Sequence, residues 1–236
     1  MATPRLLLFD VDGTLILSGG VAGRLMLKAV ATVTGKNFPY NVRDFAGYTD
    51  RLIMRRLLQQ AGVPPEAIPR KLQQAEALYL QWIAERFQNP DFVRVLPGVR
   101  ELLEHLQQHN GYYLGLLTGN IRKGAAIKLA SVGLLDYFPV GAFGDDAEDR
   151  NQLPPIALQR AQYHYGISFT PENTWIIGDA PNDVRCARAN QVRVLAVATG
   201  AIPVEELARE QPDALIPDLS HVDQVLEILE NTKPHP

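Results

Sequence analysis

Short apolar runs, each bounded by polar or turn-forming residues, recur along the chain. They lie at 6–9, 113–117, 175–177 and 192–198. Continuous apolar runs of this length are typical of strands that are buried on both faces of a parallel sheet. Segments of helical length and composition lie between them, at 99–108, 121–132, 156–165, 182–190, 204–209 and 222–229. Strands and helices in alternation predict an α/β fold with a doubly wound parallel sheet.

A different pattern occupies the stretch between the first two apolar runs. It contains no convincing buried strand, but it has helical patterns at 24–33, 50–60 and 66–86. Pro64-Pro65 separates the second pattern from the third, and Pro65 suits the first turn of a helix. We therefore predict a small all-helical domain at 18–89, inserted after the first strand of an α/β core that is formed by 1–17 and 90–236.

Composition narrows the class of protein further. The 236 residues are 46% hydrophobic and 21% charged, and their net charge is -3. These values are typical of globular proteins, and they offer no general attraction to nucleic acid or to an anionic membrane. The apolar runs are too short to span a bilayer. Because Cys186 is the sole cysteine, no internal disulfide can form, and we expect a cytoplasmic protein.

Polar clusters follow three of the predicted strands. Asp10 and Asp12 follow the first, residues 118–120 the second, and Asp179 and Asp183 the third. Ligands bind at the carboxyl ends of strands in open α/β sheets, so these groups are expected to converge. Carboxylates gathered in this way repel one another unless a cation relieves them. An all-oxygen site suits Mg²⁺, which also contacts substrate phosphates.

Each cluster also has a purely structural interpretation. Asp12-Gly13 is a common turn pair, Thr118 can cap the following helix, and 179–183 can be a loop with a helix cap. Their occurrence in order, at the ends of successive predicted strands, favours a functional site.

Three of these segments together resemble the motifs of one enzyme superfamily. Asp10-Val11-Asp12-Gly13-Thr14, Leu116-Leu117-Thr118 and Gly178-Asp179-Ala180-Pro181-Asn182-Asp183 are similar to the first, second and fourth motifs of the haloacid dehalogenase (HAD) superfamily. The helical insert lies where that family has its type-one cap domain, so the resemblance covers essentially the whole chain. The chain most resembles the phosphoglycolate phosphatase-like branch, in which a cap loop is similar to Gly47-Tyr48-Thr49-Asp50.

The resemblance implies a Mg²⁺-dependent phosphatase that acts on a small phosphorylated metabolite. Asp10 would be the nucleophile that forms an aspartyl-phosphate, and Asp12 would be the general acid and base. The Asp10 carboxylate, the backbone carbonyl of Asp12, and Asp179 would bind the metal, with Asp183 orienting them. The phosphate would be held by Thr118, Gly119 and Asn120.

One motif departs from the family pattern. The third motif normally supplies a lysine, but none occurs at 149–155. Arg150 is the best candidate to neutralise the phosphate and the nucleophile, although arginine changes the geometry. Lys123 and Lys128 are the next candidates for this role, although we expect Lys128 to be an exposed, solvated cation.

Substrate contacts are expected from insert residues that face Asp10, namely Arg24, Tyr48, Thr49 and Arg51. Two alternatives to the hydrolase remain: a phosphomutase of the same superfamily, similar to β-phosphoglucomutase, and a homologue that binds metal or phosphate with little turnover. We expect a monomer or a small homo-oligomer, with no nucleic-acid or membrane partner.

Overall fold

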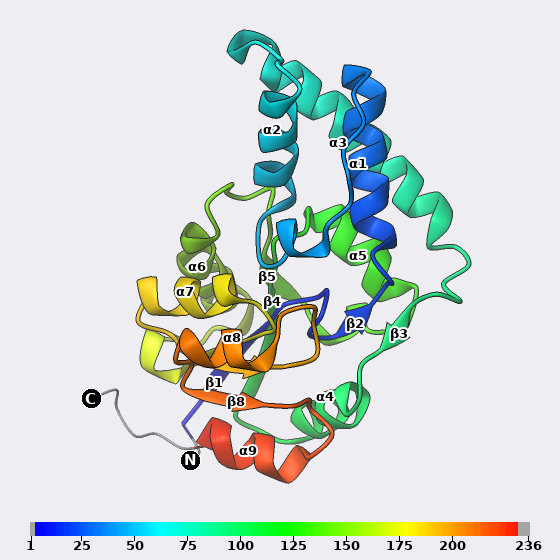
Figure 1. The fold of residues 1–236 in the computed structure, drawn as a ribbon. Coiled ribbons are helices and arrows are strands. Elements are labelled where there is room, and N and C mark those ends of the chain that lie inside the picture. Colours follow the sequence, from blue (N-terminus) through cyan, green and yellow to red (C-terminus); the bar gives the residue numbers. More distant parts are fainter. Residues whose placement is uncertain (1–2, 231–236) are drawn as a thin grey trace.

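The computed structural model describes residues 3–230, which form a parallel sheet with helices on both faces (Figure 1). The sheet strands are β1 (Arg5–Phe9), β4 (Tyr112–Leu117), β5 (Val140–Ala142), β6 (Thr174–Gly178), β7 (Arg193–Val197) and β8 (Ala214–Ile216). Their order is β5-β4-β1-β6-β7-β8, and every neighbouring pair is parallel. The predicted α/β fold class is therefore confirmed, and the predicted strands are the four central ones.

Alternate strand residues pack against helices on opposite faces of the sheet. Leu7 and Phe9 of β1 face a core completed by α4 (Val99–Gln108), α5 (Arg122–Ala130) and α9 (Val222–Glu230). Leu6 and Leu8 face the other core, which α6 (Leu153–Tyr165) and α7 (Pro181–Ala189) complete. Because both faces are covered, the strands are mostly apolar after their first residues, which explains their continuous hydrophobic pattern. Helix α8 (Val204–Arg209) lies between β7 and β8 in the chain.

The segment between β1 and α4 supplies three helices that pack on one another. They are α1 (Val21–Thr34), α2 (Asp50–Gln60) and α3 (Ile68–Arg86), and Figure 1 shows them projecting from one end of the sheet. Their shared apolar core includes Met26, Met54 and Tyr79, which are at most 1% exposed. Short 3-10 helices lie at Val42–Asp44, Pro65–Ala67, Leu135–Tyr137, Arg150–Gln152 and Pro171–Asn173.

A two-stranded antiparallel ribbon joins these helices to the sheet. Strand β2 (Ile16–Leu17) pairs with β3 (Arg94–Val95), so the chain enters and leaves the helical insert side by side. The ribbon lies within a few residues of the boundaries proposed from the sequence, at 17/18 and 89/90. The division into two domains stays a prediction.

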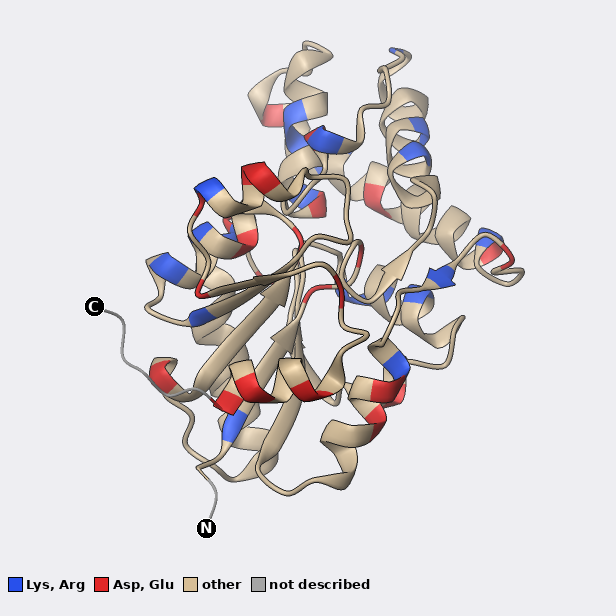
Figure 2. Ribbon diagram, turned by 60° about the horizontal axis from the view of Figure 1, so that its bottom comes forward, with Lys and Arg blue, Asp and Glu red and all other residues tan. Residues whose placement is uncertain are grey.

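Charged residues lie mostly on the helices and loops, while the strands of the sheet are almost free of charge (Figure 2). Within residues 3–230, no helix has the length and apolarity needed to cross a membrane.

Candidate active site

The carboxyl ends of β1, β4 and β6 bring the three polar clusters together, because these strands are neighbours in the sheet. Asp10 directly follows β1, and its backbone N–H donates to the carbonyl of Ile177 at 2.9 Å, which extends the sheet pairing by one residue. Asp179 directly follows β6, and Asp183 lies in the first turn of α7. The acidic side chains therefore have rigid backbone supports.

A tight loop carries the chain from Asp10 past Asp12 to β2. Gly13 has a φ of 89° within this loop, and its N–H donates to the carbonyl of Ile16. A Cβ atom at Gly13 would lie 2.2 Å from Oδ2 of Asp179, so glycine alone fits both the dihedral angle and the close approach. Thr14 donates from its hydroxyl to Oδ1 of Asp179 at 3.1 Å, which fixes that carboxylate.

Three buried carboxylates form a compact cluster. Ligand oxygens of Asp10, Asp179 and Asp183 lie within 4.8 Å of one another. Burial raises the pKa of Asp179 well above its usual value, and the neighbouring Asp10 and Asp183 raise it further. Burial also raises the pKa of Asp183, to about 6, although Arg150 opposes the shift. The cluster is an all-oxygen site with excess negative charge, which fits a divalent cation such as Mg²⁺.

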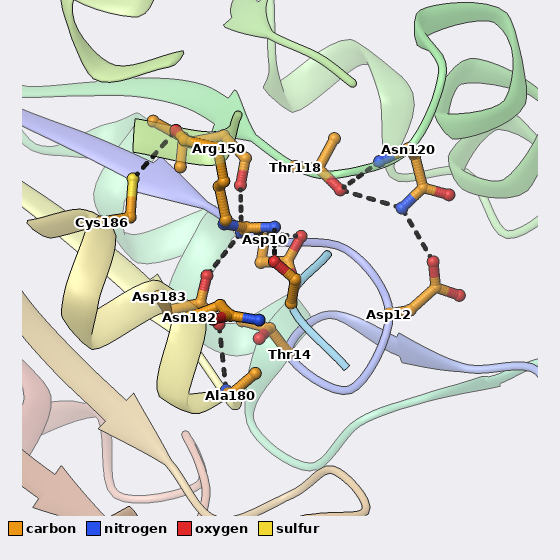
Figure 3. Close-up of polar contacts among 12 residues, drawn as sticks. Asp10, Asp12, Thr14, Thr118, Asn120, Arg150, Ala180, Asn182, Asp183 and Cys186 are labelled. Carbon is orange, nitrogen blue, oxygen red and sulfur yellow. Dashed lines mark hydrogen bonds and ion pairs between the residues drawn. The ribbon is translucent and has the colours of Figure 1, made fainter. Parts of the chain in front are cut away.

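Arg150 reaches this cluster from the 3-10 helix that precedes α6. Its Nη2 donates to Oδ1 of Asp183 at 2.5 Å and lies 3.5 Å from Oδ1 of Asp10 (Figure 3). Burial opposes its charge, but Asp183 and Asp10 hold the pKa of Arg150 above its usual value. Its Nε is buried with no hydrogen-bond partner among the described residues, so it retains a donor for an anion. The structure thus places Arg150 beside the carboxylate expected to be the nucleophile.

Lys128 contacts the other candidate catalytic acid. Its Nζ lies 2.5 Å from Oδ2 of Asp12 and 2.5 Å from Oδ1 of Asn120. Asn120 also donates to Oδ2 of Asp12 at 2.9 Å (Figure 3). The expectation that Lys128 is an exposed cation is wrong, since only 2% of the residue is exposed. The helix that carries it packs on the sheet, and its side chain points inward to a carboxylate 116 positions earlier. Lys123, by contrast, is exposed.

The loop after β4 joins this site to the insert. The hydroxyl of Thr118 accepts hydrogen bonds from the backbone and side-chain nitrogens of Asn120. Gly119 accepts from the N–H of Asp50 at 2.7 Å, and a Cβ at Gly119 would lie 2.0 Å from the carbonyl oxygen of Tyr48. Gly119 and Asn120 line the cavity described below, whereas Thr118 is fully buried beneath them.

Asp50 is a buried acid at the end of the loop Gly47-Tyr48-Thr49-Asp50, and the sequence alone assigns it no catalytic or binding role. It follows the helix cap Thr49 and accepts a hydrogen bond from the backbone N–H of Ile121. Burial raises the pKa of Asp50 to about 7, against the opposing charge of Lys128. Tyr79 lies next to it, and burial together with Asp50 raises the pKa of that phenol. The spacing of residues along the chain gives no signal for this contact between the insert and the sheet.

A cavity of about 430 Å³ lies above these groups, between the insert and the strand ends. Its floor includes Asp10, Asp12, Gly119, Asn120, Lys128, Arg150 and Asp179. Its insert side is largely apolar, with Ala22, Met26, Phe45 and Ile53 among the lining residues.

Of the four insert residues expected to contact substrate, only Tyr48 lines this cavity. Arg24 donates to the carbonyl of Gly19, and its guanidinium lies over the ring of Tyr40. The other two residues face the core loop at 145–148. Thr49 donates to the carbonyl of Glu148, and Arg51 donates to the carbonyl of Asp145 and to Glu76.

The fold and the site together place aspartates at the carboxyl ends of parallel strands, on the floor of one cavity. Residues 7–197 match the family model described as haloacid dehalogenase-like hydrolase. The chain therefore belongs to this family of hydrolases, as the sequence motifs predict.

Individual relatives agree with this assignment. The chain is 29% identical over 229 residues to a phosphoglycolate phosphatase of Nitrosococcus oceani, which covers 94% of this chain and 96% of the relative. The fold is similar to that of β-phosphoglucomutase from Clostridium difficile, with a TM-score of 0.72, 18% identity and coverage of 96% and 97% of the two chains. It is also similar to that of a predicted phosphoglycolate phosphatase from Haemophilus somnus, with a TM-score of 0.68, 21% identity and coverage of 96% and 99%.

Proposed function

We propose that the protein is a Mg²⁺-dependent phosphatase that hydrolyses a small phosphorylated metabolite through an aspartyl-phosphate on Asp10. The observation that carries the proposal is the position of Asp10 and Asp12 on the floor of one cavity, each beside a different buried cation. A binding protein has no evident need for the second acid. The phosphoglycolate phosphatases among the relatives support the same reaction class.

In the first half of the reaction, a carboxylate oxygen of Asp10 attacks phosphorus, and the bond from phosphorus to the alcohol oxygen breaks. The protonated carboxyl of Asp12 gives its proton to the departing alcohol. In the second half, the Asp12 carboxylate accepts a proton from the water that attacks the aspartyl-phosphate. Inorganic phosphate leaves, and the carboxylate of Asp10 is restored.

Each of the two acids has a buried cation beside it: Arg150 lies next to Asp10, and Lys128 next to Asp12. Arg150 holds Asp183 and faces Asp10, so it offsets negative charge where the phosphoryl group would bind. Lys128 and Asn120 hold the carboxylate of Asp12. Figure 3 shows the contact of Asn120 with Asp12, on the other side of Asp10 from Arg150. In this proposal Arg150 takes the role of the missing motif lysine, while Lys128 is a positioning residue for Asp12.

Asp10, Asp179 and Asp183 fit a divalent ion, because the three carboxylates can together carry more negative charge than the one arginine among them offsets. Mg²⁺ bound there, with the backbone carbonyl of Asp12 as a further ligand, would stabilise negative charge on the phosphoryl oxygens. The backbone N–H of Gly119 would supply a donor to the same oxygens, while Asn120, whose donors are taken by Asp12 and Thr118, would support that loop. The insert covers the cavity and would exclude water while its side chains select the alcohol.

A cytoplasmic location is part of this proposal. Cys186 is buried against the site, where its Sγ donates to the carbonyl of Arg150. Burial raises the pKa of its thiol to about 12, which suits a packing role rather than a reactive one.

Phosphate release from a panel of small phosphomonoesters tests the proposal, with Mg²⁺ and with EDTA. We expect metal-dependent release that Asp10→Asn reduces by at least about a thousandfold, because the nucleophile is lost. Arg150→Ala should lower kcat by about a hundredfold or more, while Arg185→Ala, which removes an exposed arginine paired with Glu210, should be near normal. An isomerised sugar phosphate in place of free phosphate would indicate the phosphomutase. Binding without turnover of any ester would contradict the phosphatase.

A further inference from the structure

The side of the cavity that the insert forms, the insert wall, is mostly apolar. The insert contributes Ala22, Met26, Phe45, Tyr48, Ile53 and Tyr79 to the lining. These six side chains are aliphatic or aromatic, and the two tyrosines add one hydroxyl each. The other polar side chains that the insert adds to the lining are Ser18, Tyr40 and Asp50. The phosphate would occupy the polar floor at Asp10 and Arg150, so the alcohol of the substrate faces this wall.

Within residues 3–230, none of the cavity-lining residues from the insert is Lys, Arg or His. The only carboxyl that the insert adds to the lining is Asp50. Burial raises the pKa of Asp50 to about 7. As a carboxyl group it is either neutral or negative, so it cannot neutralise an anionic substrate group.

The two cations that line the floor already have partners in the site. Lys128 lies between Asp12 and Asn120, and Arg150 binds Asp183 and the carbonyl of Leu117.

The arginines of the first two insert helices do not line the cavity, and each has a partner of its own. Arg51 and Arg55 form ion pairs with Glu76 and Glu148. Arg24 and Arg56 lie over the rings of Tyr40 and Tyr48. A second anionic group on the substrate would therefore be buried beside Asp12 and Asp50 with no cation of its own, which is strongly unfavourable.

From the apolar lining and the lack, among the described residues, of a free cation on the insert side of the cavity, we infer that the substrate is the phosphoester of an uncharged, largely apolar alcohol. Esters with a carboxylate on the alcohol, phosphoglycolate among them, are then poor substrates. The inference rests on the phosphatase function proposed above and specifies its substrate class. It separates this chain from the substrate named for its phosphoglycolate phosphatase relatives.

Matched esters test the inference directly. Benzyl phosphate and 4-carboxybenzyl phosphate differ by one carboxylate, and 2-hydroxyethyl phosphate and phosphoglycolate form a smaller pair. We expect kcat/KM to be at least tenfold higher for the uncharged member of each pair, and higher for benzyl phosphate than for glucose 6-phosphate. A preference for either carboxylate, or for the sugar phosphate, overturns the inference.

A variant pair shows whether the wall causes the discrimination. Asp50→Asn removes the one insert carboxyl from the lining, so it should narrow the ratio between benzyl and 4-carboxybenzyl phosphate several-fold. Glu66→Gln, an exposed position of the insert outside the lining, should leave that ratio unchanged. An unchanged ratio in Asp50→Asn would contradict the part assigned to that residue.

Binding to the Asp10→Asn variant separates this inference from the phosphatase proposal. Calorimetric titration with the same four esters in the presence of Mg²⁺ reports selectivity without turnover. If the wild type hydrolyses no ester, the phosphatase proposal fails, and tighter binding of the uncharged esters still supports the inference. Equal or tighter binding of the carboxylates, or binding of none of the four, overturns it.

Discussion

A buried lysine next to a partly exposed carboxylate is the least expected residue of the site. Lys128 is 2% exposed, whereas the side chain of its partner Asp12 is 39% exposed towards the cavity. A buried ammonium group is retained only where charged or polar partners replace its water, and here Asp12 and Asn120 do so. The orientation of Asp12 therefore depends on a residue of α5.

Replacing Lys128 tests this dependence. Lys128→Met should lower kcat by about ten- to a hundredfold with a smaller change in KM, because Asp12 loses its orientation while the phosphate site is kept. Lys128→Arg should restore part of the rate, since it keeps the charge but not the geometry. Steady-state kinetics at several pH values measures both variants.

The control for this prediction lies on the same helix. Lys123 is exposed, so Lys123→Met should behave as the wild type. If Lys128→Met changes thermal stability but leaves kcat and its pH profile intact, the lysine is only a structural residue.

At the residue scale, the sequence predicted the groups that lie at strand ends and missed those that depend on tertiary packing. The apolar runs locate Asp10 and Asp179, because a strand end fixes where the next side chain lies. Arg150 follows from the order of the motifs. The environments of Lys128 and Asp50 depend on contacts between distant segments, which no local pattern of polar and apolar residues encodes.

Between elements, a close backbone contact joins the loop after β4 to the loop before α2. The N–H of Asp50 donates to the carbonyl of Gly119, and the carbonyl of Tyr48 fills the space where a Cβ at Gly119 would lie. The guanidinium of Arg150 adds a long hydrogen bond of 3.4 Å to the carbonyl of Gly47. The backbone of the insert thus rests directly on the proposed phosphate site.

A methyl group at this contact should separate the two loops. Gly119→Ala would place a Cβ 2.0 Å from a backbone oxygen, which cannot give way as a flexible side chain can. We expect KM to rise by about tenfold or more, because a displacement of about 1 Å disturbs substrate positioning. Kinetics together with thermal unfolding measures the effect.

Gly124 is the matched control, because a Cβ there would make ordinary contact with Leu80 at 3.7 Å. Gly124→Ala should leave kcat and KM unchanged and raise stability by about 0.5–1 kcal/mol, since alanine favours a helix. An unchanged KM in Gly119→Ala would show that the loops are apart during catalysis.

Element prediction succeeded where hydrophobic runs are long and failed where they are short. The strands β1, β4, β6 and β7 each have five or six residues, and each was located by its apolar run. The strands β5 and β8 have three residues each, with sequences Val-Gly-Ala and Ala-Leu-Ile, and were not predicted. Three residues are too few to reveal a period, so these outer strands depend on their pairing with the sheet for their conformation.

For the molecule as a whole, the buried carboxyl of Asp50 links stability to pH. Burial raises its pKa to about 7 from 3.8, while Lys128 opposes the shift and Asp12 and Asp145 add to it. The folded chain therefore holds the proton more tightly than the unfolded chain does. The stabilisation from this group is fully present below about pH 4 and is lost as the pH rises to about 7.

Asp50→Asn should remove this loss. We expect the variant to be more stable than the wild type by about 2 kcal/mol at pH 5, and this difference should grow to about 4 kcal/mol at pH 8. These values correspond to a pKa shift of this size. Thermal unfolding of both proteins in Mg²⁺ across that range measures the gain. Glu66→Gln should follow the wild type at every pH, and a constant difference between Asp50→Asn and the wild type would contradict a raised pKa.

The ribbon of β2 and β3 has a consequence for how this protein can change over evolutionary time. Because Leu17 and Arg94 are paired, all the residues between them form a loop whose two ends are held next to each other. The core of the protein is therefore covalently joined to this loop only through the paired residues Leu17 and Arg94, whatever the loop contains. Substitutions or insertions within the three helices can therefore be accommodated while the register of β1, β4 and β6 is kept. Selection can then alter the insert side of the cavity while the aspartates on its floor stay in place.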